Sequence, residues 1–81
     1  MEKDIRLYSD AEAGNLLGKH DENIKMIEKA FDISSVFRAG ILRLIGSPED
    51  VEKAANVIRE LLIATREGIT LKKHDLNYAI K

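Results

Sequence analysis

The segment GNLLGKHD, residues 14–21, combines two glycines with a lysine, which are the residue types of phosphate-binding loops. In a P-loop, four residues separate the glycines, and a serine or threonine follows the lysine because its hydroxyl binds magnesium. Here only three residues separate Gly14 from Gly18, and Lys19 is followed by His20. The preceding residues also read as a helix, whereas a P-loop follows a strand. We therefore reject a nucleotide-binding loop at this position.

Two histidine–aspartate pairs, His20–Asp21 and His74–Asp75, are the only candidate metal ligands of note. Neither pair has the i, i+4 spacing that pre-organises a zinc site, and both residue types are common at helix starts. We expect no metal site and no cofactor. The serines and threonines lie in no strand-to-helix elbow, and the carboxylates follow polar helix faces. We expect no catalytic residue and do not expect this chain alone to be an enzyme.

The remaining chemistry is anion binding at a turn between two helices. A glycine there allows a close approach of a partner's backbone, and the amides of the following helix favour a negative group. Basic residues that could meet phosphates follow in the loop, in the second helix and in the later strands. The candidate binding residues are Gly18, Lys19, His20, Asp21, Lys25, Arg38 and Arg43.

The first half of the chain must place this turn between two helices. IRLY, residues 5–8, alternates like a strand with one buried face. Ser9 and Glu12 fit a capping box, in which the carboxylate reaches back to the cap residue, and they begin a helix over residues 10–17. We expect Gly18 to end that helix in the left-handed conformation and Asp21 to cap a second helix over residues 22–31.

The second half supplies the strands and the main helix. Residues 33–38 and 41–46 read as strands joined at Ala39-Gly40. Ser47 and Pro48 are a strong start signal for a long helix that Gly68 ends. Its apolar stripe consists of Val51, Ala54, Ala55, Ile58, Leu61, Leu62 and Thr65. We expect Leu76, Tyr78, Ala79 and Ile80 of a last short helix to dock partly against it.

Composition indicates one compact domain over residues 1–81. The chain has no cysteine, a formal net charge of −1 and 44% hydrophobic residues. Its apolar runs are far shorter than a membrane span, so we expect a cytoplasmic protein with no membrane partner. The near-zero net charge argues against strong nonspecific binding of nucleic acid. The predicted class is α+β, with a three-stranded antiparallel sheet covered on one face by helices, plus a short C-terminal helix.

The order strand, helix, helix, strand, strand, helix over residues 5–65 is similar to the type I KH fold. The segment LLGKHDENIKMI resembles the KH core motif, in which Gly-x-x-Gly joins two helices and clamps single-stranded nucleic acid. The fourth loop position, glycine in typical KH domains, is Asp21. A carboxylate there would repel the phosphates that Lys19 attracts, whereas a capping aspartate would direct its charge toward its own helix and leave Lys19, His20 and Lys25 facing outward. The resemblance also implies an apolar floor for bases, unless its residues belong to the core instead: Leu17, Ile24, Val36 and Leu44.

Within that class the chain more closely resembles the N-terminal domain of PhoH-like proteins, and this resemblance extends through a C-terminal helical extension over residues 69–81. It is carried by Gly18, Asp21, Lys25, Glu28, the hairpin at Arg38–Gly40, and Asp75, Tyr78, Ala79 and Ile80. The family resembles cytoplasmic ATPases with a P-loop domain after this module. The resemblance implies an excised domain whose nucleotide chemistry lies elsewhere in the parent protein.

Two functions remain open at this point. One is weak binding of single-stranded RNA or DNA by a KH-like module. The other is a protein-interaction or assembly module that docks on the ATPase domain of the parent or on sister subunits in a homo-oligomer. The near-zero charge, Asp21 in the loop and the apolar tail favour the second function.

Overall fold

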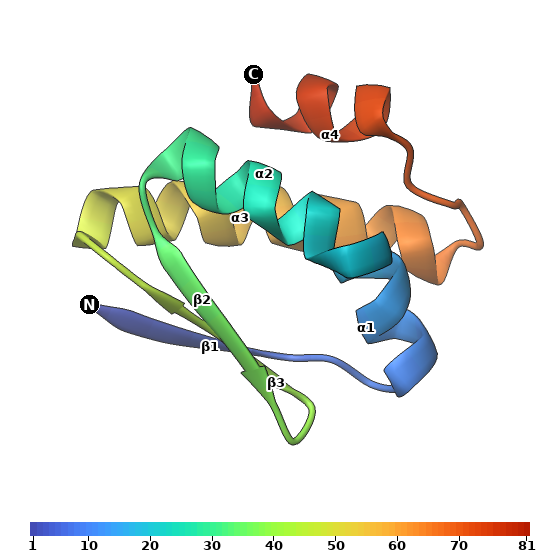
Figure 1. Ribbon diagram of the computed structural model, residues 1–81, viewed down its shortest axis with the longest axis horizontal. Helices are drawn as coiled ribbons and strands as arrows, with labels where there is room; N and C mark the ends of the chain where they lie inside the picture. Colours follow the sequence, from blue (N-terminus) through green and yellow to red (C-terminus); the bar gives the residue numbers. More distant parts are fainter.

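The computed structural model describes residues 1–81 and confirms the predicted α+β class, with one sheet and helices packed on one of its faces (Figure 1). No helix is long and apolar enough to cross a membrane. The elements in chain order are β1 (Glu2–Arg6), α1 (Asp10–Leu17), the 3₁₀ turn η1 (Lys19–Asp21), α2 (Glu22–Phe31), β2 (Ser34–Arg38), β3 (Ile41–Ile45), α3 (Pro48–Arg66) and α4 (Lys73–Ile80).

The sheet is antiparallel, with the strand order β1-β3-β2. Ala39 and Gly40 form the predicted two-residue turn between β2 and β3, and both have positive φ, at 52° and 79°, as a type I′ hairpin turn requires. Strand β1 begins three residues earlier than predicted. Its pairing extends to Leu7, whose amide donates to the Gly40 carbonyl at 2.8 Å, and excludes Tyr8.

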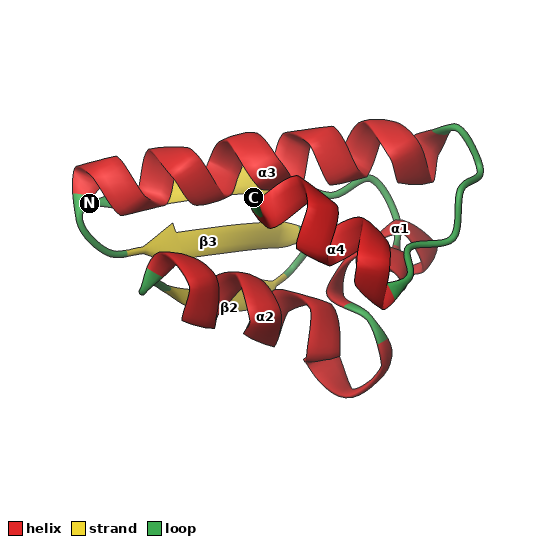
Figure 2. Ribbon diagram, turned by 90° about the horizontal axis from the view of Figure 1, so that it is seen from above, coloured by secondary structure: helices red, strands yellow, loops and turns green.

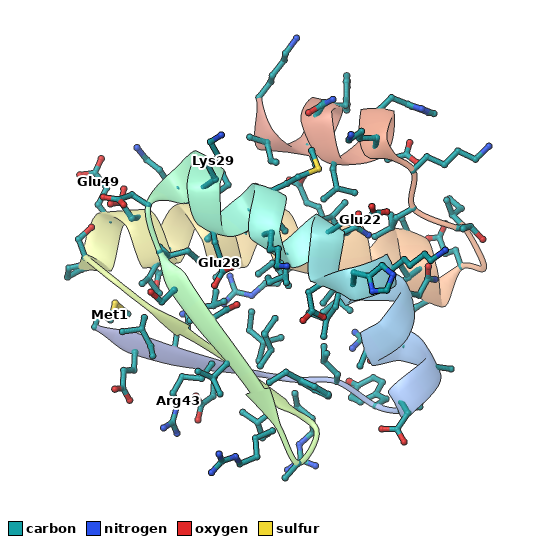
Figure 3. The ribbon with its side chains drawn as sticks, in the orientation of Figure 1. Met1, Glu22, Glu28, Lys29, Arg43 and Glu49 are labelled. Carbon is teal, nitrogen blue, oxygen red and sulfur yellow. The ribbon has the colours of Figure 1, made fainter.

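The two faces of the sheet have different surroundings. Leu42 and Leu44 of β3 are buried against the helices, at 1% and 0% exposure. Arg43, between them, lies on the uncovered face opposite Val36 and Asp4. Figure 3 shows Arg43 extending away from the helical layer. Because side chains alternate along a strand, the register assigns every strand residue to one of these faces.

Helix α3 is the main element of the core, as predicted. Ser47 Oγ accepts a hydrogen bond from the Asp50 amide at 3.3 Å, and Pro48 occupies the first turn, where its missing amide costs nothing. Its buried face consists of Val51, Ala54, Ala55, Val57, Ile58, Leu61 and Leu62. Val57 extends this face beyond the stripe read from the sequence. The predicted end is also confirmed, because Gly68 follows the helix with φ of 91°.

Helix α4 contacts α2 and α3 and lies on their side away from the sheet (Figures 1 and 2). Leu76 is completely buried there, and Ala79 and Ile80 are half-buried. The expectation that Tyr78 docks is wrong, since its side chain is 86% exposed. Tyr78 is two residues from Leu76, and a helix turns about 200° over two residues, so the two side chains point in nearly opposite directions.

The capping box predicted at the start of α1 is only half formed. Ser9 Oγ accepts from the Glu12 amide at 3.0 Å, as predicted. The Glu12 carboxylate, however, accepts from the amide of Tyr8 at 2.6 Å and not from that of Ser9. Glu12 also pairs with Arg66 at the end of α3, so it joins the start of α1 to the last turn of the longest helix.

Candidate functional site

The turn between α1 and α2 depends on an unusual backbone at Gly18. The Gly18 amide donates to the Gly14 carbonyl at 3.0 Å and ends α1. Its φ of 83° confirms the left-handed backbone expected from the sequence, whereas its ψ of 172° is extended rather than helical. This region of backbone space is essentially open to glycine alone. A Cβ on Gly18 would also lie 2.7 Å from Cγ of Asn23, so glycine is required for two reasons.

Asn23 is the only buried polar residue of the chain, at 6% exposure. Its Nδ2 atom donates to the Asn15 carbonyl at 3.5 Å, which links the first turn of α2 to the last turn of α1. The side chain therefore fills the inside of the turn that Gly18 opens. Sequence reasoning missed Asn23, because an asparagine in the first turn of an amphipathic helix is ordinarily a surface residue.

The expected capping role of Asp21 is wrong. Capping residues adopt extended backbone angles that let the side chain reach the amides of the first turn. Asp21 instead has φ of 60° and ψ of 23°, and its side chain makes no capping hydrogen bond. His20, at φ of 55°, is left-handed as well. The Asp21 carboxylate is consequently exposed beside the turn rather than directed into α2.

A groove of about 220 Å³ runs between this turn and strand β2. We call it the Phe37 groove. It is mainly apolar, with one carboxylate at its margin. Its lining residues are Leu17, Asp21, Ile24, Ser35, Phe37 and Leu42.

The edge of β2 beside the groove carries backbone groups that the sheet does not use. The Ser35 amide points away from β3 and donates to Glu28 Oε2 at 2.8 Å, and the Ser35 hydroxyl donates to the same oxygen at 3.0 Å. Figure 3 shows Glu28 extending from α2 toward β2. Because alternate residues of an edge strand point the same way, the Phe37 amide and carbonyl also face outward. They are free to bond an extended or planar polar ligand.

Two of the predicted basic residues lie near the turn in the chain, although neither lines the Phe37 groove. Lys19 is in the turn, and Lys25 is in the first turn of α2. Both are exposed, and neither forms an ion pair. His20 is exposed in the turn between them. Lys19 and Lys25 are thus two positive charges without an ion-pair partner, with the Asp21 carboxylate between them in the chain.

The other two basic residues lie on the opposite face of the sheet. Arg38 and Arg43 line a separate shallow depression of about 380 Å³ with Val36 and Asp4. Arg43 Nε donates to Asp4 Oδ1 at 2.8 Å, and this ion pair raises the pKa of Arg43 and lowers that of Asp4. The expectation that these arginines share a groove with Lys19 is therefore wrong.

The expected apolar floor is half correct. Leu17 and Ile24 line the Phe37 groove, as predicted. Val36 lies on the other face of the sheet, and Leu44 is fully buried in the core, so neither contributes. Phe37 and Leu42 take their places, since they form a cross-strand pair on the helix-facing side. Phe37 is 37% exposed and offers an aromatic surface at the groove.

The sequence of the chain is similar to part of a longer protein. No protein-family model matches the chain. The chain is similar to the PhoH-like protein of Bacillus subtilis (strain 168). The two are 30% identical over 76 residues, which cover 94% of this chain and 24% of the relative. The resemblance to PhoH-like proteins is confirmed at this level, and the chain spans about a quarter of the length of the relative it matches.

Proposed function

We propose that the chain is a KH-like module that binds single-stranded RNA in the Phe37 groove. In this proposal it serves a longer PhoH-like protein whose P-loop ATPase domain lies outside these residues. The observation that carries the proposal is the Gly18 turn, which opens a helix–helix junction toward an apolar groove and an open strand edge. The proposal is supported by the order of the elements from β1 to α3 and by the β1-β3-β2 sheet, which match what the resemblance to type I KH domains implies.

Each part of the groove has a role in this mechanism. The Gly18 turn lets the sugar–phosphate backbone pass close to the protein backbone. Lys19 and Lys25 meet phosphates as point charges. One or two unstacked bases rest on Phe37 and on the leucine and isoleucine side chains beside it. The outward amide and carbonyl of Phe37 bond base edges.

Asp21 limits the strength of this interaction. Its carboxylate makes no hydrogen bond within the protein and repels phosphates that Lys19 attracts. With only two lysines in and just after the turn, binding is weak and shows a shallow salt dependence. The chain therefore fits a module that contributes part of the affinity of a larger protein.

The test is a titration of a fluorescent single-stranded RNA of about six nucleotides, a little more than a KH domain clamps. Lys19→Ala and Lys25→Ala should each weaken binding several-fold and reduce the slope of log K against log salt by about 0.7. Lys81→Ala, an exposed lysine at the end of α4, is the matched control and should bind like the parent chain. An absence of binding at low salt, or an equal loss in all three variants, would overturn the proposal.

A further inference from the structure

A second cleft lies at the other edge of the sheet, between β1 and the C-terminal half of α3. Its volume is about 370 Å³. We call it the arginine cleft, because every charged residue that lines it is an arginine. It is lined by Arg6, Arg59 and Arg66, by Tyr8, and by apolar side chains that include Ile5 and Ile63. No carboxylate faces it, in a chain whose acidic residues outnumber the basic ones by one.

Part of this cleft is held rigid by Glu12. Its carboxylate receives both Nε and Nη2 of Arg66 and the Tyr8 amide, and its side chain is only 8% exposed. The Arg66 guanidinium lies over the Tyr8 ring, 4.1 Å from its centroid. Tyr8 and Arg66 thus form a fixed pair, although the Tyr8 side chain is 72% exposed. A planar cation on one face of the ring leaves the rest of the ring available for stacking.

Neither of the other two arginines forms an ion pair, although Arg59 contributes, after Lys3, to the lowered pKa of Glu52. Arg6 forms no ion pair and no side-chain hydrogen bond, and Arg59 donates only to the neutral amide oxygen of Asn56, at 2.9 Å. Ile63, one turn after Arg59, is 59% exposed. An arginine guanidinium matches the geometry of phosphate by two parallel hydrogen bonds. The arginine cleft therefore combines two guanidinium groups that have no ion-pair partner with an exposed aromatic ring.

We infer that the arginine cleft is a second contact for single-stranded nucleic acid, in which Arg6 and Arg59 bind phosphates and the Tyr8 ring stacks on a base. This inference rests on the proposed function, because a strand held in the Phe37 groove would supply the second segment. The two sites lie at the β2 and β1 edges of the three-stranded sheet. A strand longer than the segment that the Phe37 groove holds can therefore contact both. Linked contacts then raise the affinity for the longer strand.

The test compares single-stranded RNAs of about four and about twenty nucleotides, since four nucleotides are what a KH domain clamps and the longer strand extends beyond the Phe37 groove. The Arg6→Ala/Arg59→Ala double variant should lose about ten-fold in affinity for the longer RNA and change by less than two-fold for the shorter one. Tyr8→Leu should also weaken binding of the longer RNA, whereas Tyr8→Phe should bind it as tightly as the parent chain. Arg38→Ala, on the uncovered sheet face, is the control and should bind both RNAs like the parent chain.

The outcomes separate this inference from the proposed function. If Lys19→Ala weakens both RNAs while the double variant binds the longer RNA normally, the arginine cleft is not a contact and the groove proposal stands. If neither RNA binds the parent chain, both fail. A poly-glutamate peptide that displaces the longer RNA as well as unlabelled RNA does would show that the cleft selects only negative charge, which would also overturn the inference. Circular dichroism of each variant confirms that it is folded.

Discussion

The Cα of Gly18 faces the buried side chain of Asn23 so closely that a methyl group on it would lie 2.7 Å from Asn23 Cγ. This contact joins the end of α1 to the first turn of α2, and it positions the turn that borders the Phe37 groove. Gly18 also has a backbone conformation that other residues rarely adopt. The shape of the candidate site is therefore determined by a glycine and an asparagine, neither of which carries charge.

Gly18→Ala should destabilise the fold, whereas Gly14→Ala should not. The backbone strain at Gly18 alone amounts to roughly 1–3 kcal/mol, and the displacement of Asn23 adds to it. Gly14 is an exposed position inside α1 with open space around it, so alanine there should stabilise by about 0.5–1 kcal/mol. Urea unfolding of the two variants measures both effects. Equal stabilities would contradict the role assigned to Gly18.

Asp21→Gly should increase both stability and RNA affinity. Glycine relieves the left-handed conformation at this position, by about 1 kcal/mol, and removes a carboxylate from the groove margin. Asp21→Asn is the matched control, since it removes the charge and still tolerates this conformation. Both variants should bind the short RNA several-fold more tightly in a fluorescence titration. Weaker binding by Asp21→Asn would show that the carboxylate assists the ligand.

Glu12→Gln should lower the free energy of unfolding at neutral pH and remove part of its pH dependence. The hydrogen bond from Arg66 is the largest cause that lowers the pKa of Glu12 from its ordinary value of 4.5. A carboxyl group whose pKa is lower in the folded state stabilises the fold at pH values above its unfolded-state pKa. That contribution disappears as the pH falls through its folded-state pKa. We expect the free energy of unfolding at pH 7 to be about 1 kcal/mol lower for Glu12→Gln than for the parent chain. In unfolding experiments this difference should shrink as the pH falls below 4.5 and through the lower folded-state pKa of Glu12, and a constant difference would contradict the assignment.

Leu76→Ala should destabilise the domain by about 2–5 kcal/mol, as expected for a large side chain removed from a filled core. Leu76 is completely buried between α4 and the helices beneath it. Tyr78→Ala, on the exposed side of the same helix, should stay within about 0.5 kcal/mol of the parent chain. Thermal unfolding distinguishes the two. A small effect at Leu76 would mean that α4 is not an integral part of the fold.

The elements that the sequence predicted well are those with local signals. Ser47 and Pro48 begin α3, and Ala39-Gly40 forms the β2–β3 turn, because capping and turn preferences act over a few residues. The apolar stripe of α3 likewise needs no knowledge of its partners. These features sufficed for the α+β class and for the position of the turn near Gly18.

The errors arose where distant contacts decide the local geometry. Asp21 has the residue type of a helix cap, but the turn shaped by Gly18 and Asn23 holds it in a left-handed conformation. The separation of Arg38 and Arg43 from Lys19 was readable in principle. A two-residue hairpin pairs Phe37 with Leu42, so alternation sends both arginines to the other face. The link from Glu12 to Arg66 spans 54 positions and left no pattern in the sequence.

The most direct test of RNA binding in the Phe37 groove is an amide chemical-shift map of the chain titrated with the six-nucleotide RNA. The account predicts that the largest shifts occur at Gly18, Lys19, Lys25 and Phe37, while Arg43 and Val36 on the uncovered sheet face remain unchanged. Shifts centred on Arg43 and Val36, or no shifts at saturating RNA in low salt, would contradict it.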